Sequence, residues 1–179
     1  MFVHLMRHGI AETREFSGND HDRPLTEKGR IRTHAACWGL RELGVEPQLV
    51  LSSPLVRAYQ TAEIAREVLE IDRAIEVTDA LEPGVPPEEL IATLATFEER
   101  DVLCAGHSPN LDRVVTSVLG APFGSLFLKK CGTASLELPY LSEGASVEGQ
   151  NSFVAAVRGA ELSWLLQPSQ LRRIGGASE

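Results

Sequence analysis

The chain has 179 residues, of which 43% are hydrophobic and 23% charged, and its formal net charge at pH 7 is −8. This length suits one domain with a sizeable core, and the composition excludes a disordered or collagen-like chain. The acidic excess argues against general nucleic-acid binding, which needs a basic face, although a single cleft can still be locally positive.

Apolar runs typical of strands occur at 2–6, 48–52, 74–77, 101–105, 134–138 and 153–157. After the first run, Thr26 resembles a helix N-cap and Gly44 a C-terminal stop, which predicts a helix over 26–43. Further apolar stripes at helical spacing lie within 55–69, 90–97 and 111–119. This alternation predicts an α/β three-layer sandwich, with a mainly parallel central sheet covered by helices on both faces.

The pattern changes after residue 120, where the segments ASLEL, SFVAAV and ELSWLL follow one another without helical stripes between them. We expect a hairpin-like or edge addition to the same sheet. The polar stretch Ser142–Ser152 is expected to be a turn, and the tail from Gly175 to be frayed. Because no repeat or linker is visible, residues 1–179 are expected to form a single domain.

Targeting and redox features predict a cytoplasmic protein. No apolar run approaches the roughly 20 residues of a membrane span, and Arg7 comes too early for a signal peptide. The cysteines, Cys37, Cys104 and Cys131, are far apart and form no CxxC or Cys/His cluster. We therefore expect reduced, mostly buried thiols and no zinc site.

Two segments, SSPLVRA and GHSPNL, repeat one pattern: each follows an apolar strand with a serine, a proline and then a helix. Ser53 and Ser108 are expected to be N-caps, with Pro54 and Pro109 at the first helical position, where a missing N–H costs nothing. Free N–H groups at such helix starts attract anions, so Ser108 is counted among the candidate phosphate-binding residues.

Four cationic or titratable residues are expected at one edge of the sheet. Arg7 and His8 end the first strand, Arg57 lies in the first turn of a helix, and His107 follows the strand at 101–105. Ligands of open α/β sheets bind at the carboxyl ends of the strands. Two guanidinium groups and two imidazoles there describe a pocket for a tetrahedral dianion such as phosphate.

The histidine after the first strand is the candidate nucleophile. A neutral imidazole can attack phosphorus, and the nearby arginines should keep His8 neutral near pH 7. Arg7, Arg57 and a protonated His107 would stabilise charge on the oxygens in flight. Gly9 is expected to let the backbone pass close to the phosphate and to adopt an unusual backbone angle.

The motifs MRHG, RPLTEKG, SSPLVRAYQTAE and GHSPNL, in this order, resemble the histidine phosphatase superfamily, which has the phosphoglycerate mutase-like fold. The short length and the segments LKKCGTASLEL and ELSWLLQPSQL are most similar to its SixA-type phosphohistidine phosphatases. The resemblance implies that His8 is the phosphorylated nucleophile, that Arg7, Arg57 and His107 form the phosphate pocket, and that no metal or cofactor takes part.

The resemblance also bears on the leaving group and the substrate. Many members use an acid from between Arg57 and His107, which here would be Glu82, whereas SixA-type members often lack an obvious acid. The 58–106 segment already holds a helix, a strand and another helix, so little chain remains for a lid. An open pocket suits a phosphohistidine presented by a phosphorelay or phosphocarrier protein.

Two other functions remain open at this point. One is a broad-specificity phosphomonoesterase acting on small metabolites. The other is a catalytically weak phosphate-binding protein, against which the intact set of four pocket residues argues. The polar loop that contains Asp20, Asp22 and Arg23 could rim the pocket, and the sequence does not choose among these three residues.

Overall fold

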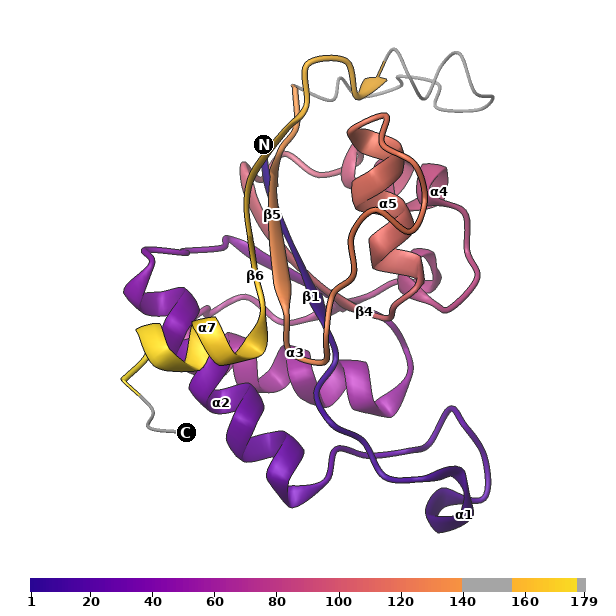
Figure 1. The fold of residues 1–179 in the computed structure, drawn as a ribbon, viewed down its shortest axis with the longest axis vertical. Coiled ribbons are helices and arrows are strands. Elements are labelled where there is room, and N and C mark those ends of the chain that lie inside the picture. Colours follow the sequence, from indigo (N-terminus) through magenta and orange to yellow (C-terminus); the bar gives the residue numbers. More distant parts are fainter. Residues whose placement is uncertain (140–155, 177–179) are drawn as a thin grey trace.

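A computed structural model describes residues 1–139 and 156–176, and these form one six-stranded mixed sheet with the order β3-β2-β4-β1-β5-β6 (Figure 1). The strands are β1 (Phe2–Arg7), β2 (Leu49–Ser52), β3 (Glu76–Val77), β4 (Asp101–Gly106), β5 (Thr133–Glu137) and β6 (Glu161–Leu166). The first four are parallel to one another, whereas β5 pairs antiparallel with β1 and β6 antiparallel with β5. The predicted mainly parallel sheet is confirmed, and the expected hairpin-like or edge addition is the antiparallel pair β5 and β6.

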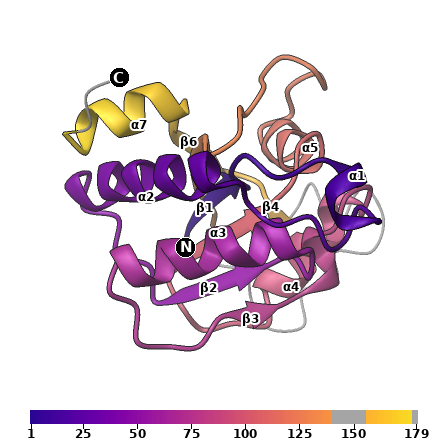
Figure 2. The same ribbon diagram turned by 90° about the horizontal axis from the view of Figure 1, so that it is seen from below.

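Helices cover both faces of this sheet. They are α1 (Arg14–Ser17), α2 (Glu27–Glu42), α3 (Val56–Val68), the 3₁₀ turn η1 (Asp79–Leu81), α4 (Pro87–Leu94), α5 (Asn110–Val118) and α7 (Pro168–Ile174). Figures 1 and 2 show α2, α3 and α7 on one face and α4 and α5 on the other. The architecture is the predicted α/β sandwich.

The apolar strands supply two separate cores because successive side chains of a strand point to opposite faces. In β1, Val3 and Leu5 pack under α4 and α5, whereas Met6 packs under α2 and α3. In β4, Cys104 and Leu103 divide in the same way. Burial on both faces explains why the parallel strands are almost continuously apolar. Polar side chains therefore occur mainly beyond the buried strands, where each strand ends.

The local helix signals are confirmed for α2 but not for α3 and α5. The Thr26 side chain accepts a hydrogen bond from the Gly29 N–H at 2.9 Å, as an N-cap does. The predicted caps Ser53 and Ser108 are wrong: α3 is preceded by Leu55 and α5 by Pro109. The chain after β2 stays extended for longer than the proline pattern implied, so the helix begins later.

The carboxyl-terminal predictions are partly outside the described residues. The expected turn at Ser142–Ser152 lies there, as does most of the expected strand at 153–157. Ala156 and Val157 are not in a strand, and the edge strand β6 comes later in the chain. The three cysteines are buried and free, as expected. Of the helices in the described ranges, none combines the length and apolar character that a membrane span requires.

Candidate active site

Three neighbouring parallel strands end at one edge of the sheet, and each delivers a polar residue there. His8 follows β1, His107 follows β4 and Ser53 follows β2. Backbone hydrogen bonds continue the strand pairing past the strand ends, from the His8 N–H to Gly106 O at 2.9 Å and from the Ser53 N–H to Ala105 O at 3.0 Å. The ends of the ladders therefore fix where these side chains start.

A cavity of about 260 Å³ opens at this edge. It is lined by Arg7, His8, Ala11, Asp20, Arg23, Arg57, Pro83, His107, Ser108 and Lys130. All four predicted pocket residues meet in it, although they come from three separate parts of the chain. The rings of His8 and His107 are tilted by 55° relative to each other, with centroids 5.0 Å apart, and both line the cavity although each is at most 5% exposed.

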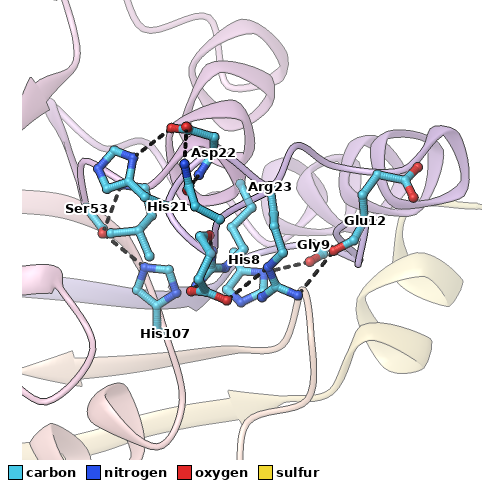
Figure 3. A network of polar contacts seen from close by, with 12 residues as sticks. His8, Gly9, Glu12, His21, Asp22, Arg23, Ser53 and His107 are labelled. Carbon is cyan, nitrogen blue, oxygen red and sulfur yellow. Dashed lines mark hydrogen bonds and ion pairs between the residues drawn. The ribbon is translucent and has the colours of Figure 1, made fainter. Parts of the chain in front are cut away.

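The ring of His8 has a defined orientation. Its Nδ1 lies 2.7 Å from Gly9 O, and because a carbonyl oxygen only accepts, Nδ1 carries the hydrogen. Nε2 therefore keeps its lone pair, as a nucleophile needs; Figure 3 shows His8 beside Gly9. Burial, and then the neighbouring His107, lower the pKa of His8 to about 2. The predicted neutral state is confirmed, with burial rather than the arginines as the main cause.

His107 differs from its prediction. Its Nε2 lies 2.9 Å from the Ser53 hydroxyl, as Figure 3 shows. Burial, followed by the charge of Arg57, lowers the pKa of His107 to about 3. The expected protonated imidazole is therefore wrong, because burial beside a guanidinium disfavours a second positive charge.

The two arginines are anchored by different parts of the chain. Arg7 donates from Nη1 to Leu128 O at 2.7 Å, and its guanidinium stacks on the Phe127 ring at 5.3 Å. Arg57 donates to the backbone oxygen of Asp20 at 2.6 Å and to Asp20 Oδ2 at 2.9 Å. The Nε atoms of both arginines are buried without a hydrogen-bond partner among the described residues. These guanidinium groups thus keep unused donors.

The loop before α2 contributes two residues that the sequence left undecided. Asp20 pairs with Arg57 and also with Arg23, whose Nε lies 3.1 Å from Asp20 Oδ1. Arg23 also donates to Glu12 O at 3.1 Å (Figure 3). Asp22 instead contacts His21 on the exposed side of the loop. A carboxylate and a third guanidinium therefore line the cavity, and only the contacts of Asp20 with Arg57 and Arg23 identify them.

Ser108 lines the cavity, but its hydroxyl donates to Asp112 Oδ1 at 3.0 Å. The same oxygen accepts the Leu128 N–H at 3.0 Å. Leu128 in turn holds Arg7 through its carbonyl oxygen. The buried Asp112 is thus a positioning residue that the sequence analysis missed. The signal that could have identified it is its position directly after the GHSPNL motif.

Two further predictions concern Glu82 and Gly9. Glu82 is half-buried, and its neighbour Pro83, rather than Glu82 itself, lines the cavity. The expected unusual backbone angle of Gly9 is wrong, because Gly9 does not adopt a left-handed conformation. A Cβ there would overlap Thr33 Oγ1 and lie 3.1 Å from Leu25 Cδ2, so packing against α2 requires the glycine.

No cluster of three or more potential metal-ligating side chains occurs among the residues that the structure describes. The chemistry of the cavity itself is that of an anion site, since three guanidinium groups surround two neutral imidazoles. Such a site can bind a tetrahedral oxyanion and present it to the Nε2 lone pair of His8.

Comparison with known proteins gives a consistent result. A model of the histidine phosphatase superfamily (branch 1) matches residues 3–82. An uncharacterised protein of Picosynechococcus is 35% identical over 140 residues, which cover 76% of this chain and 84% of that protein. A solved structure of the protein histidine phosphatase SixA complexed with tungstate has a TM-score of 0.76 at 24% identity, over 96% of this chain and 99% of that one.

Small-metabolite phosphatases share the fold as well. The structure of phosphoserine phosphatase from Entamoeba histolytica in complex with 3-phosphoglyceric acid has a TM-score of 0.65 at 14% identity. The match covers 95% of this chain and 98% of that protein. At these identities, the structural matches establish the fold alone.

Proposed function

The chain belongs to the histidine phosphatase superfamily, and we propose that it removes phosphate from phosphohistidine on a protein, through a covalent intermediate on His8. The observation that carries the proposal is the state of His8. Its Nδ1–H is held by Gly9 O, and its free Nε2 lies in a cavity lined by three guanidinium groups. A neutral nucleophile beside a cationic oxyanion site is what phosphoryl transfer needs.

The first step transfers the phosphoryl group to the enzyme. His8 Nε2 attacks phosphorus and forms a new N–P bond while the P–N bond to the substrate imidazole breaks. The electron pair of that bond goes to the leaving nitrogen, which takes up a proton. Arg7 and Arg57 stabilise the negative charge on the transferring oxygens, and a neutral His107 can donate one hydrogen bond to them.

The second step restores the enzyme. Water attacks the phosphorus of phosphorylated His8 and loses a proton to the solvent. The N–P bond then breaks, its electron pair returns to Nε2, and inorganic phosphate leaves. An ester substrate would depend on an acid such as Glu82 for its leaving group, whereas the P–N bond of phosphohistidine breaks more readily.

The chain between the two halves of the pocket supports a protein substrate. Residues 58–106 form most of α3 and then β3, η1, α4 and β4, all of which build the sheet or its cover. From this segment only Pro83 lines the cavity. The side chain of another protein could therefore reach His8 without the opening of a lid built from this segment. The fold shared with SixA is consistent with this choice.

Two measurements test the proposal. Brief incubation with a histidine protein carrying labelled phosphate should leave acid-labile label on the wild type and on His34→Ala, a variant of an exposed histidine, but none on His8→Ala. Turnover of the phosphohistidine protein should then exceed that of p-nitrophenyl phosphate and of sugar phosphates. Far faster release from sugar phosphates would contradict the protein substrate and favour the phosphomonoesterase.

A further inference from the structure

A second cavity, of about 320 Å³, lies beside the cavity that contains His8 and His107, and we call it the basic cavity. Its lining residues are Arg7, Ile10, Arg32, Phe127, Lys129, Lys130, Cys131, Pro168 and Arg172. Five of these nine residues are cationic and none is acidic, in a chain that has 25 acidic and 17 basic residues. The local charge is therefore opposite to the charge of the whole chain.

The cations of the basic cavity come from distant parts of the sequence. Arg32 lies on α2, Lys129 and Lys130 precede β5, and Arg172 lies on α7. None of these four forms an ion pair with a residue that the structure describes. Like charges repel, so such a cluster gains free energy when an anion joins it.

The basic cavity adjoins the proposed catalytic pocket. Arg7 and Lys130 line both cavities. Burial, and then the charge of Arg7, lower the pKa of Lys130, with smaller effects from Arg23 and Arg57. Lys130 thus lies within the field of the phosphate-binding guanidinium groups. A group attached close to a phosphate bound at His8 would enter the basic cavity.

The walls of the basic cavity indicate what that group is. Ile10, Phe127 and Pro168 add apolar surface to the cations, and Phe127 remains 56% exposed. Exposed aromatic residues and arginines are typical of protein interfaces. An aspartate or glutamate side chain matches both features, because its stem is apolar and its end anionic.

We propose that the basic cavity binds an acidic side chain that flanks the phosphohistidine of the protein substrate. This inference rests on the proposed function. It assigns Arg32, Lys129 and Arg172 a role in substrate selection rather than in the transfer of phosphate, because they line only the basic cavity. A second anionic group on a small metabolite is the competing occupant.

The test uses the triple variant Arg32→Gln/Lys129→Gln/Arg172→Gln. The KM for a phosphohistidine protein with acidic flanking residues should rise about ten-fold, with kcat nearly unchanged, since three favourable charges are lost. Hydrolysis of p-nitrophenyl phosphate should change less than about two-fold. The control Arg30→Gln, an exposed cation on the same helix outside the cavity, should leave both substrates unaffected.

Three results would overturn the inference: an unchanged KM for the phosphoprotein, an equal loss with p-nitrophenyl phosphate, or an effect confined to small substrates with two anionic groups. Binding of an unphosphorylated acidic peptide, followed by fluorescence anisotropy, separates this inference from the proposed function. The wild type should bind the peptide in a salt-sensitive way and the triple variant should not, even if the phosphohistidine protein is not turned over. Absence of peptide binding to the wild type would refute the proposed role of the basic cavity and leave the proposed function untouched.

Discussion

Acidification should destabilise this protein at pH values well above those at which carboxylates become protonated, because two buried histidines resist protonation. The folded-state pKa is about 2 for His8 and about 3 for His107, whereas an unfolded histidine titrates near 6.5. Below that value the unfolded chain binds protons that the folded chain does not. The free energy of unfolding therefore falls as the pH falls, starting near the unfolded pKa.

The magnitude follows from the linkage relation. Between about pH 7.5 and about pH 5, one ring with a folded pKa well below 5 lowers the free energy of unfolding by about 2 kcal/mol. The two rings together should lower the free energy of unfolding by about 4 kcal/mol. The result hardly depends on the folded values, because both rings stay neutral across this interval. A loss of this size is a large part of the stability of an ordinary domain.

Urea denaturation at a series of pH values measures the effect. His8→Asn and His107→Asn should each reduce the fall in unfolding free energy by about half. Ser53→Ala removes the hydrogen bond to His107 but no titratable group. It should therefore lower the free energy of unfolding at every pH without changing how much that free energy decreases on acidification. If the double histidine variant loses as much stability on acidification as the wild type, the buried, neutral state of these rings is refuted.

Two further predictions concern the pocket and the packing of α2. Asp20→Asn removes the carboxylate that pairs with Arg57 in the cavity, so inorganic phosphate should inhibit about two- to five-fold more strongly; weaker inhibition would mean that Asp20 is needed to hold Arg57. Gly39→Ala would drive a methyl group into Leu171 O of α7, and thermal and urea unfolding should show a loss of about 1–3 kcal/mol. An unchanged midpoint would show that α7 shifts freely.

Much of the fold and half of the site could be predicted from local patterns. Alternating apolar strands and helical stripes require a sheet buried on both faces. In such a sheet the parallel strands end together, so His8 and His107 had to approach one another. The cap at Thr26 and the turn at Gly44 mark the two ends of α2. They could be predicted because each signal depends on only a few neighbouring residues.

The remainder depended on contacts between segments that are far apart in the sequence. The pKa of His107 is set by burial and by Arg57, and Gly9 is required by Thr33 of α2. The choice of Asp20 over Asp22 depends on where the loop meets α3.

The sequence by itself determined the order of elements, the place of the candidate nucleophile and the cationic character of the pocket, since these follow from residue type and from the geometry of parallel strands. Only the tertiary structure decided the protonation of the imidazoles, the partners of the arginines and the basic cavity. Desolvation and charge–charge interactions depend on distances through space, and those distances are defined only when the elements are packed.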